Sequence, residues 1–166
     1  MLVIMGIDPG TAITGYGVIE VSERNFTARD FGCIRTSAEQ ALYERLVKIY
    51  EGLRNIMETN KPDCVVIEEI FFNKNSRTAM AVGHARGVAI LAAAHLNIPI
   101  MEYTPLQVKQ ALVGYGRADK IQVQKMVRIL LNLKEIPRPD DVADALGLAI
   151  CHAHYKNYKD FEKGFS

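Results

Sequence analysis

The chain has 166 residues, of which 49% are hydrophobic, and its net charge is +1. This length fits a single domain, residues 1–166, built around one core. No apolar run reaches the roughly 18 residues of a membrane helix, and the N-terminus lacks the basic leader of a signal peptide, so we expect no membrane partner. Three widely spaced cysteines suit reduced core residues and a cytoplasmic location.

The small net charge hides an uneven distribution. Between Phe72 and Arg138 there are ten basic and three acidic residues, whereas the remainder holds 10 basic and 16 acidic residues. A basic centre between acidic ends suits a protein that holds a polyanion over a metal-binding acidic site. On charge alone, a scatter of solvated surface residues is an equal alternative.

The first part of the chain predicts three strands. Leu2–Ile7 is a continuous apolar run, as expected for a strand buried on both faces. Gly15–Val21 and Phe26–Thr36 have strand-like composition, and the polar segment Ser22–Asn25 between them favours a turn. We therefore expect an antiparallel unit of three strands linked by hairpins.

Helices and strands alternate in the rest of the chain. Apolar residues recur at helical spacing over Ala41–Thr59, and Thr78–Leu96 is an Ala-rich helix whose small apolar residues extend around much of its circumference. Such a helix is buried on more than one side, in the core or against a partner chain. The other predicted elements are the strands Cys64–Ile67 and Ile98–Tyr103 and the helices Leu106–Leu112, Ile121–Leu131 and Asp140–His154. This pattern predicts an α/β fold with a mixed five-stranded sheet covered by helices.

Acidic residues follow two of the buried strands. Asp8 ends the first strand and precedes a Pro-Gly turn, while Glu68 and Glu69 end the strand Cys64–Ile67. Open α/β sheets place ligands at the carboxyl ends of their strands. Asp8 could equally accept hydrogen bonds within the turn. The two glutamates point to opposite faces, and strand alternation does not say which of them faces a site.

A second pair of acids opens the last predicted helix. Asp141 and Asp144 are three residues apart, which puts both on one face of the helix. Acids also favour the first turn of any helix, and Asp140 or Asp141 could cap its N-terminus. Asp144 precedes the apolar run Ala145–Cys151, so its carboxylate needs a partner close to the core.

The four acids Asp8, Glu68, Asp141 and Asp144 together suggest a site for hard cations. Carboxylate oxygens suit Mg²⁺, with Mn²⁺ as a substitute. Two such ions about 4 Å apart can activate a water and stabilise the leaving oxygen of a phosphodiester. We therefore expect two ions per active site and hydrolysis of a nucleic-acid backbone.

Aromatic and basic residues near these acids suggest a nucleic-acid partner. Phe71 and Phe72 are adjacent in an otherwise polar loop, where they could stack on unpaired bases or anchor the loop in the core. The basic residues Lys109, Arg117 and Lys120 surround a glycine-containing loop between two predicted helices. This loop could track phosphates or serve only as a solvated connector.

These motifs, in this order, resemble the RuvC family of Holliday-junction resolvases. The likeness runs from about Ile4 to Tyr155, and the tail Lys156–Ser166 matches nothing. Each segment alone is weak, whereas the ordered set is highly specific. Matching segments include Gly-Ile-Asp-Pro-Gly-Thr (6–11), Ile-Glu-Glu-Ile-Phe (67–71), Ala-Arg-Gly-Val-Ala-Ile (85–90), Gly-Tyr-Gly-Arg-Ala-Asp-Lys (114–120) and Asp-Asp-Val-Ala-Asp-Ala-Leu (140–146).

The resemblance implies an RNase H-like fold with its five strands in the order 3-2-1-4-5. It implies a homodimer that nicks a four-way DNA junction symmetrically with Mg²⁺, in recombination and DNA repair. Asp8, Glu68, Asp141 and Asp144 become the catalytic metal ligands, so Glu68 is preferred over Glu69. Asp140 is then left as the cap of the last helix. The likeness also implies association with a RuvA–RuvB branch-migration complex.

The same resemblance assigns residues to DNA and to the partner subunit. Phe71 becomes the base-stacking wedge, and Lys109 and Lys120 lie near the strand that is cut. The implied DNA-binding set is Phe71, Phe72, Lys74, Arg77, Lys109, Arg117 and Lys120. The implied dimer interface on the Ala-rich helix is Ala81, His84, Ala85, Gly87, Val88 and Leu91.

Two other functions fit parts of the sequence. The segment from Asp8 to Thr11 resembles the first phosphate loop of actin-like ATPases and sugar kinases, but the second loop and an adenosine-binding lobe are not found. A non-catalytic junction-binding module is the other alternative. Such a module would gain from losing negative charge beside phosphates, and the intact set of four acids argues against it.

Overall fold

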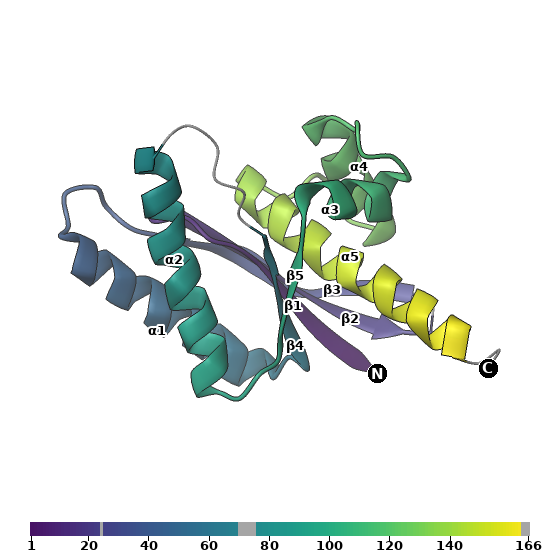
Figure 1. Cartoon of the computed structure of the whole chain (residues 1–166), viewed down its shortest axis with the longest axis horizontal. Helices are drawn as coiled ribbons and strands as arrows, with labels where there is room; N and C mark the ends of the chain where they lie inside the picture. The colour runs from purple at the N-terminus through teal and green to yellow at the C-terminus, as the bar shows by residue number, and fades with distance from the viewer. Residues whose placement is uncertain (24, 70–75, 164–166) are drawn as a thin grey trace.

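The fold is built on one five-stranded sheet, seen in the computed structural model of Figure 1, which describes residues 1–23, 25–69 and 76–163. The strands lie in the order β3-β2-β1-β4-β5. β1 pairs antiparallel with β2 and parallel with β4, and β5 continues parallel to β4. The predicted mixed sheet and its strand order are confirmed. The strands are β1 (Leu2–Asp8), β2 (Ile13–Ser22), β3 (Asn25–Arg35), β4 (Cys64–Glu68) and β5 (Ile100–Tyr103).

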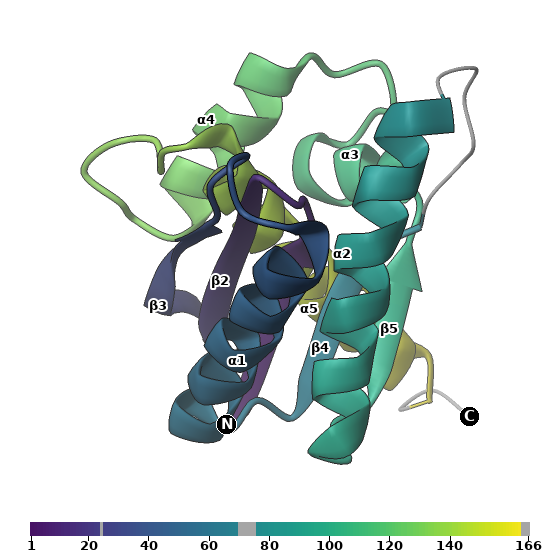
Figure 2. The same cartoon turned by 90° about the vertical axis from the view of Figure 1, so that its left-hand side faces the viewer.

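Helices cover both faces of the sheet. They are α1 (Leu42–Asn60), α2 (Ser76–His95), α3 (Pro105–Val113), α4 (Lys120–Leu130) and α5 (Asp140–Lys163). Figures 1 and 2 show α1 and α2 side by side on one face, and α5 along the other face next to α3 and α4. Two hydrophobic clusters result, one beneath α1 and α2 and one beneath α5. Within the described ranges, none of the helices has the length and apolar character needed to cross a membrane.

The observed ends of the elements lie within two residues of the predicted ones, with one exception. Capping fixes two of the short helices, since Thr104 before α3 and Asp119 before α4 each form a capping box. The exception is α5, which was expected to end at His154 and continues to Lys163. No proline or glycine lies between these two positions. The end of the apolar pattern is therefore not the end of the helix.

The backbone of α5 lies very close to β1 and β2 because glycines lie beneath it. A Cβ atom at Gly15 would overlap the backbone carbonyl of Asp141, and one at Gly6 would overlap the carbonyl of Ala145. A larger residue at either position would lift the helix from the sheet. These glycines therefore set the distance between the edge of the sheet and the acidic first turns of α5.

Replacing Gly15 by alanine tests this contact. The added methyl group would meet backbone atoms that cannot rotate away, so we expect Gly15→Ala to lower the free energy of unfolding by about 1 to 3 kcal/mol. Urea denaturation measures the change. The matched control is Gly83→Ala on α2, where an added Cβ meets no atom of its own chain within 4 Å. The control should gain about 0.5 to 1 kcal/mol because alanine favours the helix. Unchanged stability of Gly15→Ala would show that α5 has room to move.

Candidate active site

Asp8 and Glu68 meet at one edge of the sheet because they end two neighbouring parallel strands. Ile7 of β1 is in register with Ile67 of β4, so the next residue of each strand leaves the sheet at the same level. Side chains alternate between the two faces along a strand. Ile7 and Ile67 both pack in the cluster beneath α1 and α2. Asp8 and Glu68 therefore face α5 on the opposite side.

The neighbouring Glu69 does not belong to this group. It lies one residue beyond the end of β4 and is exposed. Its backbone N–H donates to the carbonyl of Tyr103 at 2.8 Å. Strand alternation left either glutamate open, and the geometry brings Glu68 to the side of Asp8.

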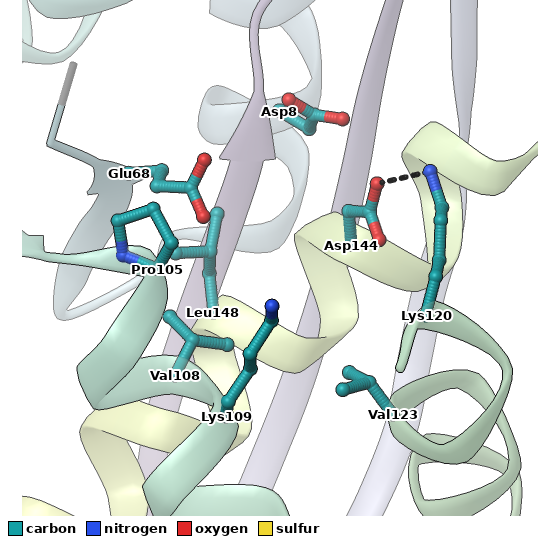
Figure 3. Close-up of a pocket in the computed structure, with 9 residues that line it drawn as sticks. All are labelled: Asp8, Glu68, Pro105, Val108, Lys109, Lys120, Val123, Asp144 and Leu148. Atoms are coloured by element: carbon teal, nitrogen blue, oxygen red, sulfur yellow. Dashed lines mark ion pairs between the residues drawn. The ribbon is translucent and has the colours of Figure 1, made fainter. Parts of the chain in front are cut away.

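The helix α5 brings the other two acids. Asp144 lines the same cavity as Asp8 and Glu68 (Figure 3). Asp141 sits over Gly15, the residue that pairs with Asp8 across β1 and β2. The charge of Asp141 acts on Asp8, whose pKa it raises. Asp141 thus lies beside the acid cluster, although it is not among the residues that line the cavity.

Asp140 does not cap α5 as predicted. It lies in the first turn of the helix, and its carboxylate forms ion pairs with Arg138 and with Lys120, the latter at 3.5 Å. These cations compete with the backbone N–H groups for the same carboxylate oxygens. Arg138 is a neighbour in the sequence, whereas Lys120 comes from another helix and is brought close only by the fold.

The acids line a cavity of about 250 Å³. Figure 3 shows Asp8, Glu68 and Asp144 entering it from β1, β4 and α5, with Lys109 reaching in from α3 and Lys120 from the start of α4. No local sequence pattern predicts the rest of the wall, because its residues come from three helices that meet only in the fold. This apolar wall consists of Pro105, Val108, Val123 and Leu148.

The acids lie close enough together to resist simultaneous ionisation. Burial raises the pKa of Asp8 to about 7, and the charges of Asp144, Asp141 and Glu68 add to the rise. Burial also raises the pKa of Glu68 and that of Asp144. Carboxyl groups with a pKa near neutrality are concentrated at functional sites.

Two lysines oppose this accumulation of negative charge. The ammonium group of Lys120 lies 3.2 Å from the carboxylate of Asp144, the pair marked by the dashed line in Figure 3. Burial disfavours its charge, but the carboxylates of Asp144 and Asp140 outweigh burial and raise the pKa of Lys120. Lys109 lowers the pKa of Glu68 against the effect of burial. The cavity therefore presents cations and anions on facing walls.

The chemistry of these donors fits a hard divalent cation. Carboxylate oxygens are the preferred ligands of Mg²⁺ and Mn²⁺, and a cation here would favour the ionised form of Asp8, which burial and the neighbouring acids disfavour. Among the described residues, no three His, Cys, Asp or Glu side chains lie near enough to one another to hold an ion as they stand. Like charges repel, and Lys120 pairs with Asp144. Ligation therefore requires the carboxylates to rotate toward a common point.

The chain matches a known family over almost its whole length. Residues 4–152 match the sequence model of the crossover junction endodeoxyribonuclease RuvC. The chain belongs to the RuvC family. The RuvC of Desulforamulus reducens is 58% identical, over 94% of this chain and 96% of that protein. The RuvC of Alkaliphilus oremlandii is 57% identical, over 98% of this chain and 99% of that protein.

A RuvC structure has the same fold. The T. thermophilus RuvC in complex with Holliday junction substrate superimposes with a TM-score of 0.91 at 38% sequence identity. The match covers 96% of this chain and 97% of that chain. The expected RNase H-like fold is thereby confirmed.

The residues that the RuvC likeness assigns to DNA fall in different places. Lys109 and Lys120 line the cavity. Arg117 is exposed between α3 and α4 and is not part of the cavity wall. Outside the described part of the structure lie Phe71, Phe72, Lys74 and the side chain of Arg77.

The helix α2, which the RuvC likeness assigns to the dimer, is covered by its own chain on one side. Ala85 is fully buried in that core, so it offers no surface to a partner and does not belong to the interface. The other assigned positions are at least partly accessible: Ala81, His84, Gly87, Val88 and Leu91. At helical spacing, the exposed side of α2 forms one stripe, the α2 stripe, composed of Met80, His84, Gly87 and Leu91.

Replacing Asp8 by asparagine should stabilise the metal-free protein at neutral and alkaline pH. The pKa of Asp8 is about 7 in the folded chain and near 3.8 without the fold. The folded state thus binds the proton more tightly, and the free energy of unfolding falls as the pH rises from about 4 to about 7. The shift corresponds to at most about 4 kcal/mol. We expect Asp8→Asn to be more stable by about 1 to 3 kcal/mol near pH 8.

Urea denaturation in the presence of a chelator measures this difference. Near pH 4 the gain should almost vanish, because Asp8 is then largely protonated in the folded chain. Glu69→Gln, at the exposed neighbour of the cluster, is the control and should change stability little at either pH. Equal stability of Asp8→Asn and the unchanged chain near pH 8 would contradict the raised pKa of Asp8 that burial and repulsion produce.

Proposed function

We propose that this chain is a structure-selective endonuclease that resolves four-way DNA junctions by nicking two strands symmetrically. The observation that carries the proposal is the convergence of acids from distant parts of the chain on a lysine-flanked cavity in a RuvC-family protein. Its relatives are named crossover junction endodeoxyribonucleases, and the T. thermophilus relative forms a complex with a Holliday junction substrate. The reaction is hydrolysis of a DNA phosphodiester bond, in recombination and repair.

In this proposal Asp8, Glu68, Asp141 and Asp144 hold the divalent cations, two Mg²⁺ ions that Mn²⁺ can replace. When bound, the cations supply the charge that activates the attacking water and stabilises the leaving oxygen. The acids contribute the ligand oxygens, and they must be ionised to bind a cation. Burial and mutual repulsion oppose this ionisation. Ligation and loss of protons are therefore linked in this cavity.

Lys109 and Lys120 hold the strand that is cut. Both project into the cavity toward the acids, and an ammonium group forms strong hydrogen bonds with phosphate oxygens. Lys120 can exchange the carboxylate of Asp144 for a phosphate oxygen, since both are anionic acceptors. The apolar wall limits the entry of water and so strengthens these charge interactions.

Contacts with the rest of the junction come from residues around the cavity. Arg117, Lys74 and Arg77 follow the phosphate backbone, which attracts basic side chains in a salt-dependent way. Phe71 stacks on a base that is unpaired at the crossover, with Phe72 beside it. These roles rest on the family resemblance.

Symmetric nicking requires two active sites in one assembly, which a two-fold homodimer supplies. We assign the dimer contact to the α2 stripe. Its support is an exposed row of apolar and small residues, with Met80 63% and Leu91 48% exposed. The dimer would work with a RuvA–RuvB branch-migration complex, in the cytoplasm.

Asp8→Asn should lower the rate at which a synthetic four-way junction is cleaved in Mg²⁺ by more than about 100-fold. The loss is this large because the substitution removes a metal ligand and not merely a group that supports one. Mapping the nicks on end-labelled strands by gel electrophoresis measures this loss. Glu69→Gln should cut at the unchanged rate, since Glu69 is exposed and lies outside the cavity. Absence of paired nicks with the unchanged chain, or normal nicking by Asp8→Asn, would refute the proposal.

Leu91→Glu should convert the homodimer to monomers. The substitution would bury an unpaired charge in the apolar contact, so we expect the dissociation constant to rise by about 100-fold or more. Sedimentation velocity over a range of concentrations measures it. The control is Ile129→Glu on α4, where the replaced side chain is 59% exposed but lies on another helix. If both variants sediment like the unchanged chain, the α2 stripe is not the interface.

A further inference from the structure

Arg86 reaches from α2 to the end of the strand that carries Glu68. Its Nε donates to the backbone carbonyl of Glu68 in a long hydrogen bond of 3.4 Å. Its guanidinium also forms an ion pair with Glu102 of β5. The Arg86 side chain is only 18% exposed. One planar cation with several donors thus joins α2, β4 and β5 beside the site.

Arg86 approaches Glu68 from the face of the sheet opposite the cavity. Glu102 is in register with Ile67, whose side chain packs in the cluster beneath α1 and α2. Glu102 and Arg86 therefore lie on that face. The Glu68 side chain lies on the other face and lines the cavity. Arg86 can contact the main chain of Glu68 without approaching the reacting groups.

The contacted carbonyl lies where the pairing of β4 ends. The register of β4 with the short edge strand β5 closes with Glu68 beside Tyr103, and the N–H of Glu69 donates to the Tyr103 carbonyl. Strand ends open more readily than strand centres. The peptide group is planar, so a cation that holds the Glu68 carbonyl also limits the direction in which the chain leaves the strand.

We propose that Arg86 is a positioning residue for the metal site. By holding the Glu68 carbonyl and tethering it to Glu102, it fixes the backbone from which the Glu68 carboxylate projects. The inference rests on the proposed function of Glu68 as a metal ligand. Groups that orient a metal ligand typically contribute about 10- to 100-fold in metal affinity. A purely structural role would change stability and leave metal affinity unchanged, so metal affinity is the property that reports a positioning role.

Binding of Mn²⁺ to the full chain in the absence of DNA tests the proposal, by calorimetry and by electron paramagnetic resonance. We expect Arg86→Met to weaken Mn²⁺ binding by about 10-fold or more. Glu102→Gln should weaken it less, in the same direction, because Arg86 loses its tether. The double variant should lose no more than Arg86→Met alone, since both changes break one connected set of contacts.

The matched control is Arg54→Met, in another arginine–glutamate pair. The Nε of Arg54 lies 2.9 Å from Glu58 on α1, with the two side chains 49% and 45% exposed. Arg54→Met should leave Mn²⁺ affinity unchanged. If Arg86→Met binds Mn²⁺ as tightly as the unchanged chain, whatever its melting temperature, the proposal is overturned. Additive losses of Mn²⁺ affinity in the double variant would also overturn it. If Arg86→Met does not fold, Glu102→Gln decides, and unchanged affinity there overturns the proposal.

Asp8→Asn separates this proposal from the one on which it rests. If the unchanged chain binds Mn²⁺ and Asp8→Asn does not, the metal site stands and the Arg86 variants report only on positioning. If the unchanged chain binds no Mn²⁺, or Asp8→Asn binds it equally well, the metal site and the role of Arg86 both fall.

Discussion

The contact between the backbone of α5 and the glycines of β1 and β2 is the constraint on which the site depends. The sheet supplies Asp8 and Glu68, and the helix supplies Asp141 and Asp144. Larger residues beneath the helix would hold these two pairs apart, and the acids would then act on one another less strongly. With glycines at the contact, burial raises the pKa of Asp8 to about 7, and the charges of the neighbouring acids add to the rise.

Such a cluster weakens the metal-free fold, because buried charges of one sign repel. The hydrophobic clusters on the two faces of the sheet supply the stability that this repulsion opposes. Lys120 offsets part of the repulsion by its ion pairs with Asp144 and Asp140. A bound cation would relieve this repulsion, so folding and cation binding are linked.

The sequence predicted what local patterns determine. Strands and helices follow from apolar periodicity and capping residues, and the strand order followed from the family resemblance. Asp8 could be found because a polar residue directly after a buried strand is visible locally. The choice between Glu68 and Glu69 was not visible, since it depends on which face of the sheet carries α5. The resemblance chose Glu68, and the geometry gives the physical reason.

Contacts between elements account for what the sequence did not predict. Asp140 pairs with Arg138, two residues away, and with Lys120 from another helix, and only the fold brings Lys120 close to it. Ala85 shares its composition with the exposed side of α2, and only packing shows that it faces the core. Arg86 counted as one more charge in the basic centre. Its two partners, Glu68 and Glu102, lie on β4 and β5, which are far apart in the sequence and neighbours only in the sheet.

The acid cluster joins the first strand of the chain to its last helix, which has a consequence for the order of folding. The β1–β2–β3 hairpins form from neighbouring segments, whereas the packing of α5 on β1 joins segments that are far apart in the sequence and so forms late. A chain that is only partly synthesised has Asp8 and Glu68 but lacks Asp141 and Asp144. In the proposed function cleavage requires all four acids, so the topology would delay nuclease activity until α5 has been synthesised and has packed on the sheet.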